Sequence, residues 1–336
     1  MKDTPQEVTL LSHSAFRNQV GFVSWLLQQD GICLNVPVSF KNGLSSALII
    51  AARGGHAEII NMLIAATTKC KLDLKLFCGC PFAKPHGAIW HAAYEGHRSA
   101  LSLLLQHQEG DLSQLQEAYF WLADSLITSL SKPASDSIKM LLTDEFKNKI
   151  ALSGRNSEGD GVLYIAAKHE RWRNFGILLE HHAHDVEDLN HSLFEVVNHG
   201  HVIYLKKFLQ PPLKDVIDLG AHDSEDYSLL EIAFGGRIGC IRPPLFTECV
   251  NHHLTAGLLM MHHNYPKEQK DALFKKLKGD LGDLRNPEDL REVTDCGRWD
   301  ALLCILQVMD DPKDLNYVAR QAALADQDEI MNLLTL

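Results

Sequence analysis

The sequence predicts an all-α protein built as an array of repeated helix pairs. Two segments, Ala47–His56 and Ala88–His97, align without gaps at an offset of 41 residues. Each continues into an apolar stretch, at 59–64 and 100–105. A third copy begins at Val162, 74 residues after the second, which leaves room for one more unit between them. Similarity at such offsets is typical of a solenoid, in which each repeat is one supersecondary unit.

The spacing inside one unit explains why it folds as two helices. Leu48, Ala51 and Ala52 lie at i, i+3 and i+4, so they share one helical face. The small alanines let a second helix approach closely. The glycines at 54 and 55 end the first helix because glycine accepts a positive φ, and residues 59–64 form the buried stripe of the second. Each pair leaves apolar surface on both sides, so neighbouring pairs must stack on it.

Weaker copies extend the array over most of the chain. We count roughly nine units, the further ones lying at 11–27, 118–142, 192–201, 228–236, 289–306 and 318–334. Long connections, which usually enlarge a binding edge, separate some units, at 65–87, 143–161 and 210–227. We expect degenerate repeats over 1–236, a helical insertion over 237–288 with helices near 245–261 and 268–284, and terminal repeats with a cap over 289–336.

The paired alanines followed by glycine and histidine resemble the ankyrin-repeat family, whose first helix carries this pattern. Ala51-Ala52 with Gly55-His56 match it, as do Ala92-Ala93 with Gly96-His97. The Thr-Pro that opens the family's first helix is absent from every copy. The resemblance implies an ankyrin-type helix-pair solenoid that binds a partner protein on its concave face. At the turns, we interpret His56, His97 and His201 as hydrogen-bonding residues of the repeat boundaries.

The long inserts are also similar to those of ankyrin-repeat effectors that intracellular bacteria inject into host cells. The acidic residues 326–329 followed by Leu333 and Leu334 look like the tail that such secretion systems read. This likeness implies an effector that acts on host proteins in the host cytosol.

Composition narrows the classes of partner. The chain has 336 residues, 32 Lys and Arg against 43 Asp and Glu, and a net charge of −11. We therefore expect no nucleic-acid partner, because phosphate binding needs a concentrated basic surface. The chain shows no signal peptide and no apolar run of transmembrane length, so we expect no membrane partner. Eight cysteines in such a chain are expected to be reduced thiols in the cytoplasm.

One loop has the residue types of a zinc site. Cys70, Cys78, Cys80 and His86 lie within 17 residues, and zinc takes four thiolate or imidazole ligands. Cys-x-Cys is tighter than the usual zinc spacing, and no second pair follows. We therefore expect free cysteines, no bound metal and no cofactor.

The alternative function is a cysteine-dependent hydrolase or transferase with its site in or near 237–288. Cys240 and Cys249 lie close in sequence to His252 and His253, with Asp223 or Glu248 as orienting groups. Such a site needs the thiol and the imidazole in contact, which sequence proximity does not supply. The sequence contains no phosphate loop, nucleophile elbow or zinc-protease motif. We therefore interpret these residues as structural and expect no enzyme.

The predicted binding face uses side chains at corresponding places on the first helices. Tyr94 and Phe234 follow the small pairs, so their rings should turn away from the contact between helices. Exposed aromatic residues beside charges are typical of binding hot spots. Several members of this face are acidic, so we expect a partner with a basic surface. The face comprises His91, Tyr94, Glu95, Lys168, His169, Glu195, Asn198, Glu231, Phe234, Glu292 and Asp295.

Overall fold

The structure, a computed structural model, is an array of helix pairs that divides into two compact units. Unit 1 is Met1–His184 and unit 2 is Asp185–Leu336. The two domain boundaries expected from the sequence, after residues 236 and 288, both lie within unit 2. The structure describes residues 9–40, 43–66, 86–107, 112–125, 127–129, 132–181, 185–233, 246–280, 290–308 and 314–335.

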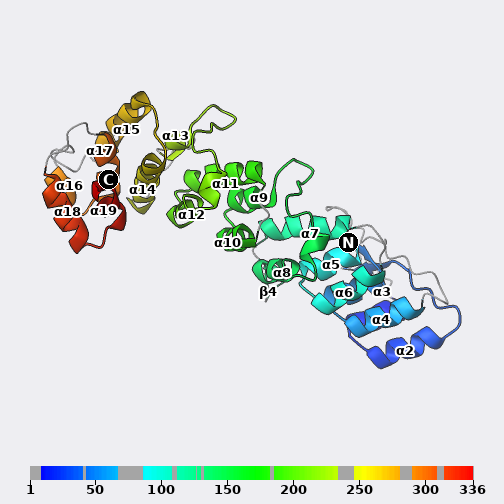
Figure 1. Cartoon of the computed structure of the whole chain (residues 1–336). Helices are drawn as coiled ribbons and strands as arrows, with labels where there is room; N and C mark the ends of the chain where they lie inside the picture. Colours follow the sequence, from blue (N-terminus) through cyan, green and yellow to red (C-terminus); the bar gives the residue numbers. More distant parts are fainter. Residues whose placement is uncertain are drawn as a thin grey trace, which may run out of the picture. The chain divides into compact units, whose positions relative to one another are not determined.

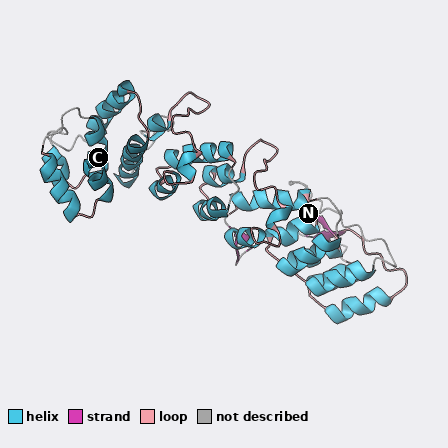
Figure 2. Ribbon diagram, in the orientation of Figure 1, coloured by secondary structure: helices cyan, strands magenta, loops and turns pink. Residues whose placement is uncertain are grey.

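Unit 1 consists of five helix pairs arranged in two rows (Figures 1 and 2). The first helices pack against one another in chain order and form what we call the first-helix row: α1 (Leu10–Phe16), α3 (Ala47–Gly54), α5 (Ala88–Tyr94), α7 (Ser113–Asp124) and α9 (Val162–Lys168). The second helices line the other side: α2 (Val20–Gln28), α4 (Ala57–Ala65), α6 (Arg98–His107), α8 (Ala134–Leu141) and α10 (Trp172–His181).

Short hairpins and a 3-10 turn complete unit 1. β1 (Val38–Phe40) pairs with β2 (Gly43–Ser45) in antiparallel register, with Val38 opposite Ser45. β3 (Ile127–Ser129) pairs with β4 (Lys132–Pro133) between α7 and α8. A 3-10 turn, η2 (Lys147–Lys149), follows α8. The described residues thus contain little strand, as expected, although the hairpins themselves were not predicted.

Seven helix pairs share one turn, which explains how the two helices of each pair become antiparallel. One or two residues after the first helix of each of these seven pairs, the backbone has a positive φ, a conformation that glycine adopts without strain. The seven are Asn18, Gly55, Gly96, Glu170, Gly200, Gly297 and Asp326, with φ between 52° and 70°. The next N–H then bonds back to the first helix, as from His56 to the Ala51 carbonyl at 2.9 Å and from His97 to the Ala92 carbonyl at 2.8 Å. These bonds satisfy carbonyls that the helix end leaves open.

The small alanines of the first helices lie where neighbouring helices meet. Ala51, Ala52, Ala92 and Ala93 are all fully buried, and α3 packs on both α1 and α5. The predicted histidine bridge between units is confirmed for His97, whose Nε2 lies 3.1 Å from the Arg53 carbonyl oxygen of the preceding pair.

The C-terminal end of α7 is held by α10. Asn174 is buried, and its Nδ2 donates to the carbonyls of Leu122 at 3.1 Å and Ser125 at 2.6 Å. The Arg171 side chain donates to the Asp124 carbonyl. Helix ends leave carbonyls without intrahelical partners, so these contacts fix the last turn of α7.

Unit 2 continues the helix pairs with a change in its middle. Its elements are α11 (Val186–Asn198), α12 (Val202–Phe208), η3 (Leu213–Asp215), α13 (Leu229–Ala233), α14 (Phe246–His262), α15 (Lys267–Asp280), α16 (Leu290–Asp295), α17 (Trp299–Val308), α18 (Leu315–Leu324) and α19 (Asp328–Thr335). The helices expected in the insertion correspond to α14 and α15. α14 packs on α12, α13 and α17, so it occupies the place of a second helix.

The predicted fold class, an all-α helix-pair solenoid with long loops and added helices, is confirmed for the described residues. Every helix within the described ranges is too short or too polar to span a lipid bilayer.

The shared turn supplies a test of the fold. We expect Gly55→Ala to lower the free energy of unfolding by about 1 to 2 kcal/mol, because an L side chain is strained at that φ. The new Cβ would also lie 2.5 Å from Nδ1 of His97. Gly21→Ala in α2 is the control, since its Cβ meets no atom within 4 Å and alanine favours a helix by roughly 0.5 to 1 kcal/mol. Urea denaturation measures both, and a stable Gly55→Ala variant would contradict the turn.

Candidate functional site

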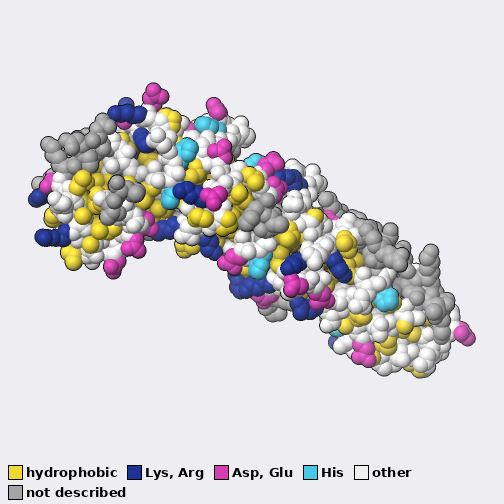
Figure 3. Space-filling model, viewed as in Figure 1, with side chains coloured by type: hydrophobic (Ala, Val, Ile, Leu, Met, Phe, Trp, Pro, Cys, Tyr) yellow, Lys and Arg dark blue, Asp and Glu magenta, His cyan; other side chains and the backbone are white. Residues whose placement is uncertain are grey.

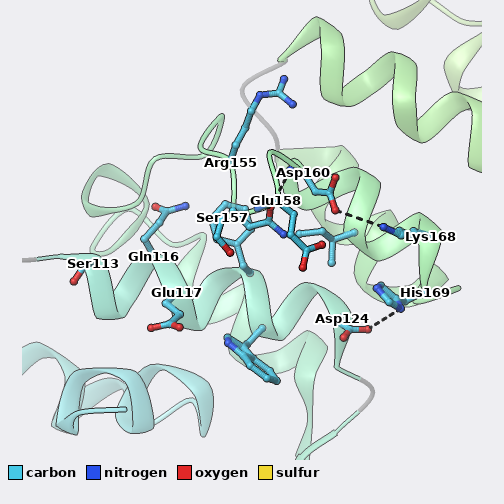
Figure 4. A pocket seen from close by; sticks show the side chains of 14 residues that line it. Ser113, Gln116, Glu117, Asp124, Arg155, Ser157, Glu158, Asp160, Lys168 and His169 are labelled. Carbon is cyan, nitrogen blue, oxygen red and sulfur yellow. Dashed lines mark hydrogen bonds and ion pairs between the residues drawn. The ribbon is translucent and has the colours of Figure 1, made fainter. Parts of the chain in front are cut away.

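A groove of about 700 Å³ opens on the first-helix row of unit 1. One wall is α7, the other is α9, and the loop 151–161, which we call the finger, closes one end (Figure 4). The groove is lined by Ser113, Gln116, Glu117, Phe120, Trp121, Asp124, Arg155, Asn156, Ser157, Glu158, Asp160, Ile165, Lys168 and His169.

The α7 wall is one face of that helix. Its lining residues are spaced three or four apart, from Ser113 to Asp124, which places them on a single stripe. The opposite stripe, including Leu115, Ala118 and Leu122, is fully buried against the neighbouring helices. Burial of one stripe therefore presents the other to the groove.

Hydrogen bonds fix the finger at both its base and its tip. The Gln116 side chain makes two hydrogen bonds to Ala151: its Nε2 donates to the Ala151 carbonyl at 3.0 Å, and its Oε1 accepts the Ala151 N–H at 2.8 Å. At the tip, Asn156 Oδ1 accepts the N–H groups of Glu158 and Asp160 at 2.8 and 2.9 Å. A bridge between Arg155 and Gly161 closes the finger before α9 begins. The finger is thus a defined wall of the groove.

Charged pairs link the α9 wall to the finger and to α7. Lys168 Nζ lies 3.6 Å from Asp160 Oδ2, and His169 Nδ1 lies 3.5 Å from Asp124 Oδ1 (Figure 4). Arg171 is also 3.6 Å from Asp124. Ile165 contributes buried apolar surface from α9. The groove therefore combines apolar patches with a rim of both charges.

An aromatic cluster lies beside the groove, formed by His86, Trp90, Tyr94 and Trp121. His86 and Tyr94 both stack on Trp90, with ring centroids 3.8 and 4.5 Å from the Trp90 centroid. Trp121 meets His86 and Trp90 edge-on, at 5.9 and 6.4 Å. Trp90 is 7% exposed but Trp121 is 44% exposed, so the cluster supports an indole that borders solvent and lines the groove.

The Tyr94 hydroxyl ties this cluster to α7. Its oxygen lies 3.0 Å from Ser125 Oγ. Ser125 Oγ donates its own proton to the Trp121 carbonyl at 2.7 Å, so Tyr94 is the donor to Ser125. Tyr94 therefore connects α5 to the end of α7 instead of standing free on the surface.

The structure brings part of the predicted binding face together. Lys168 and His169 line the groove, and Tyr94 belongs to the adjoining aromatic cluster. His91 makes edge contacts with Trp90 at 5.0 Å and with His86 at 6.4 Å. Glu95 caps α5 and is half-buried.

The other members of the predicted binding face belong to unit 2, where several of them accept hydrogen bonds from neighbouring residues. Glu195 is 9% exposed, and its carboxylate receives Asn198 Nδ2 at 3.5 Å. Glu231 accepts the Ser228 N–H at 2.8 Å and the Ser228 hydroxyl at 2.7 Å, which is a capping box at the start of α13. Asp295 of α16 accepts the Tyr317 hydroxyl. Glu292 lies in α16, and Phe234 lies outside the described residues.

The metal and thiol candidates are only partly described. Cys70, Cys78, Cys80 and Cys240 lie outside the described residues, as does the side chain of Cys249. Elsewhere in the described part of the chain, no group of three His, Cys, Asp or Glu side chains is placed to hold a metal ion.

His253 belongs to a buried ion cluster. Its Nδ1 lies 3.0 Å from Asp300 Oδ2, and Arg298 Nη2 donates to the same oxygen at 3.1 Å. Burial alone would raise the pKa of Asp300, but the hydrogen bonds from His253 and Arg298 hold that pKa below its usual value. Cys304 lies nearby, with its thiol donating to the His253 carbonyl at 3.1 Å and not to the ring. Burial raises the pKa of this thiol, which is the opposite of an activated nucleophile.

Comparisons with known proteins give structural likenesses. No protein-family model matches the chain, and no curated protein matches it in sequence. The human ASB11 ankyrin repeat domain is similar at 16% identity and a TM-score of 0.46, over 77% of this chain and all of that one. The ankyrin repeat domain of Bcl-3, a member of the IkappaB protein family, is similar at 14% identity and a TM-score of 0.48, over 67% of this chain and 93% of that one.

The helix pairs, their shared turn and the stacked first helices establish the architecture from the chain itself. The chain folds as an array of ankyrin-type helix pairs.

Sequence reasoning missed Trp121, the finger and the α7 side of the groove. Placing the unit at 118–142 omitted the first five residues of α7, which include Ser113, Gln116 and Glu117. The stripe at 113, 117, 120, 121 and 124 was visible as a helical spacing of polar and aromatic residues. A start signal was lacking, because Leu112 caps the helix without a side-chain hydrogen bond.

Acid should reveal that His91 is neutral in the folded protein. Burial, then the positive charge of Arg53 and the neighbouring His86, lower its pKa from 6.5 to about 3. The unfolded chain therefore binds a proton first, so folding stability is lost as pH falls below 6.5 toward 3. We expect His91→Gln to lose roughly 1 to 2 kcal/mol less stability than the parent between pH 7 and pH 5. Urea denaturation at both pH values measures this difference, and identical losses would contradict a neutral buried His91.

Proposed function

We propose that the protein is an interaction scaffold that holds a segment of a partner protein in the groove of unit 1. The observation that carries this proposal is Trp121, a 44% exposed indole that lines a groove walled by fixed elements. Tryptophan is among the residues enriched in binding hot spots, and these residues cluster in pockets that desolvate on binding. A groove of this volume falls within the range of pockets that hold a ligand of a few residues.

Rigidity of the walls supports the proposal. Asn174 and Arg171 hold the end of α7, and Gln116 holds the finger. A preformed groove loses little conformational entropy when a partner binds. The two members of the predicted binding face that line the groove are Lys168, the last residue of α9, and His169, its C-cap.

The composition of the surface bears on the kind of partner. Acidic and basic side chains are interspersed on the visible face of the described residues (Figure 3). The groove itself is lined by Glu117, Asp124, Glu158 and Asp160 against Arg155 and Lys168. This surplus of carboxylates favours a partner surface that is basic and disfavours phosphate groups.

A role on host proteins as a secreted effector would be tested by a translocation assay with a reporter fusion. The alternative of a thiol enzyme gains no support from Cys304, the buried cysteine that contacts the His253 backbone.

Affinity capture with matched tryptophan variants tests the proposal. Trp121→Ala should reduce capture of the partner at least tenfold, because a hot-spot residue contributes about 2 kcal/mol or more. Trp25→Ala is the control, since Trp25 is also exposed, at 52%, but lies in α2 and stacks on Phe22. Quantitative mass spectrometry compares the captured proteins, and thermal melting checks that both variants fold.

A specific partner must therefore be retained by the parent and by Trp25→Ala and be lost from Trp121→Ala. Retention by Trp121→Ala with loss from Trp25→Ala would place the binding face elsewhere and refute the groove.

A further inference from the structure

The indole of Trp121 is held in a fixed orientation at the groove. His86 and Trp90 contact it edge-on, with interplanar angles of 82° and 80°. Perpendicular contacts of this kind are favourable for aromatic rings and restrict rotation of the side chain. Because Trp121 is 44% exposed, the part of its ring that does not face the aromatic cluster is open to a ligand.

Carboxylates from two elements line the same groove as this indole. Glu117 precedes Trp121 by four residues on α7, so the two side chains are neighbours on the helix surface. Glu158 projects from the finger and is exposed (Figure 4). Among the residues that the structure describes, the Glu158 carboxylate has no ion pair.

The remaining carboxylates of the groove already have cationic neighbours. Asp160 is 3.6 Å from Lys168, and Asp124 lies 3.5 and 3.6 Å from His169 and Arg171. Glu117 contacts His86 at 3.9 Å, and that pair is ionic only when the histidine is protonated. Arg155, a further cation of the groove, donates to the Gly159 carbonyl of the finger at 3.0 Å. Glu117 and Glu158 add one carboxylate from α7 and one from the finger to the groove that Trp121 lines.

We propose that the partner segment supplies an arginine whose guanidinium stacks on Trp121 and donates hydrogen bonds to Glu117 and Glu158. This inference rests on the proposed function and specifies the chemistry of the segment bound. A cation above an indole face is attracted by the ring quadrupole, and tryptophan is the best ring for it. The guanidinium is planar and stacks on the ring, and its donors match carboxylates in pairs.

Arginine fits the groove better than lysine. An ammonium is a compact, strongly hydrated charge, so it gains less from an aromatic face and loses more on leaving water. The apolar surfaces of Phe120 and Ile165 line the same groove and suit the aliphatic stem of arginine or flanking apolar residues.

Four short peptides test this chemistry directly. The probes are acetylated, amidated Ala-Leu-X-Leu-Ala with arginine, lysine, citrulline or glutamate at X. Citrulline keeps the planar shape of arginine but lacks its charge. The chain has five tryptophans, so ¹⁵N-labelled full-length protein gives five indole N–H signals, and Trp121→Phe assigns that of Trp121.

The arginine probe should shift the Trp121 signal with saturation, while the citrulline and glutamate probes bind at least tenfold more weakly and lysine lies between. Glu158→Gln should weaken arginine binding about three- to tenfold, and Glu117→Gln similarly. Asp136→Asn is the matched control, an exposed carboxylate on α8 outside the groove, and should bind as the parent does. Raising NaCl to 0.5 M should weaken binding, because salt screens exposed charges.

Equal binding of arginine and citrulline probes, or no shift of the Trp121 signal by arginine, would overturn the proposal. So would unchanged affinity of both Glu158→Gln and Glu117→Gln. This failure is separable from failure of the proposed function. A partner lost from Trp121→Ala but retained by Glu158→Gln would keep the groove and reject arginine, whereas arginine binding with a partner retained by Trp121→Ala would reject the groove as its binding face.

Discussion

The whole structure depends on the close stacking of first helices through paired small residues. One helix pair cannot bury both of its apolar sides, so its stability comes from its neighbours. In unit 1 this contact is made by fully buried alanines such as Ala52 and Ala93. A larger side chain at either position would force adjacent helices apart, and overpacking of a close contact is destabilising. The same contact sets the distance between α5 and α7, which brings the aromatic cluster to the edge of the groove.

The groove follows from this packing and from one departure from regular repeats. The chain between α8 and α9 is long enough to form the finger, and Gln116 fixes the finger against α7. A regular short connection would leave α7 and α9 with a flat surface between them. Repeat arrays vary their loops without disturbing the stack, so binding properties concentrate there. In this chain the finger adds Glu158 and Asp160 to a wall that α7 already lines with Glu117 and Trp121.

The helix pairs were predictable because their signals are local. Apolar residues that recur at helical spacing, together with the Gly-His turns, predicted α3 to α6, α9 and α10. The apolar pattern of residues 245–284 predicted α14 and α15. The position of Glu170 shows a limit of the glycine signal. Its φ is 57° in the same turn where other pairs use glycine, so the packing of the pair imposes the conformation even on a residue that disfavours it.

The candidate site was less predictable because it depends on contacts between distant residues. Tyr94 was expected to stand on an open face, but its hydroxyl donates to Ser125, 31 residues away. Glu231 has the spacing of a capping box with Ser228, a signal that was present in the sequence and points to a local role. Trp121 could be assigned to a helix, yet its exposure depends on where His86, Trp90 and the finger lie.

Hydrogen exchange measured with and without the bound partner tests the central claim most directly. If the partner lies in the groove of unit 1, amide protection should increase in the finger, at 151–161, and in the neighbouring ends of α7 and α9, while α2 and α14 keep their exchange rates. Protection confined to unit 2, or to the second helices of unit 1, would contradict the claim that this groove is the binding face.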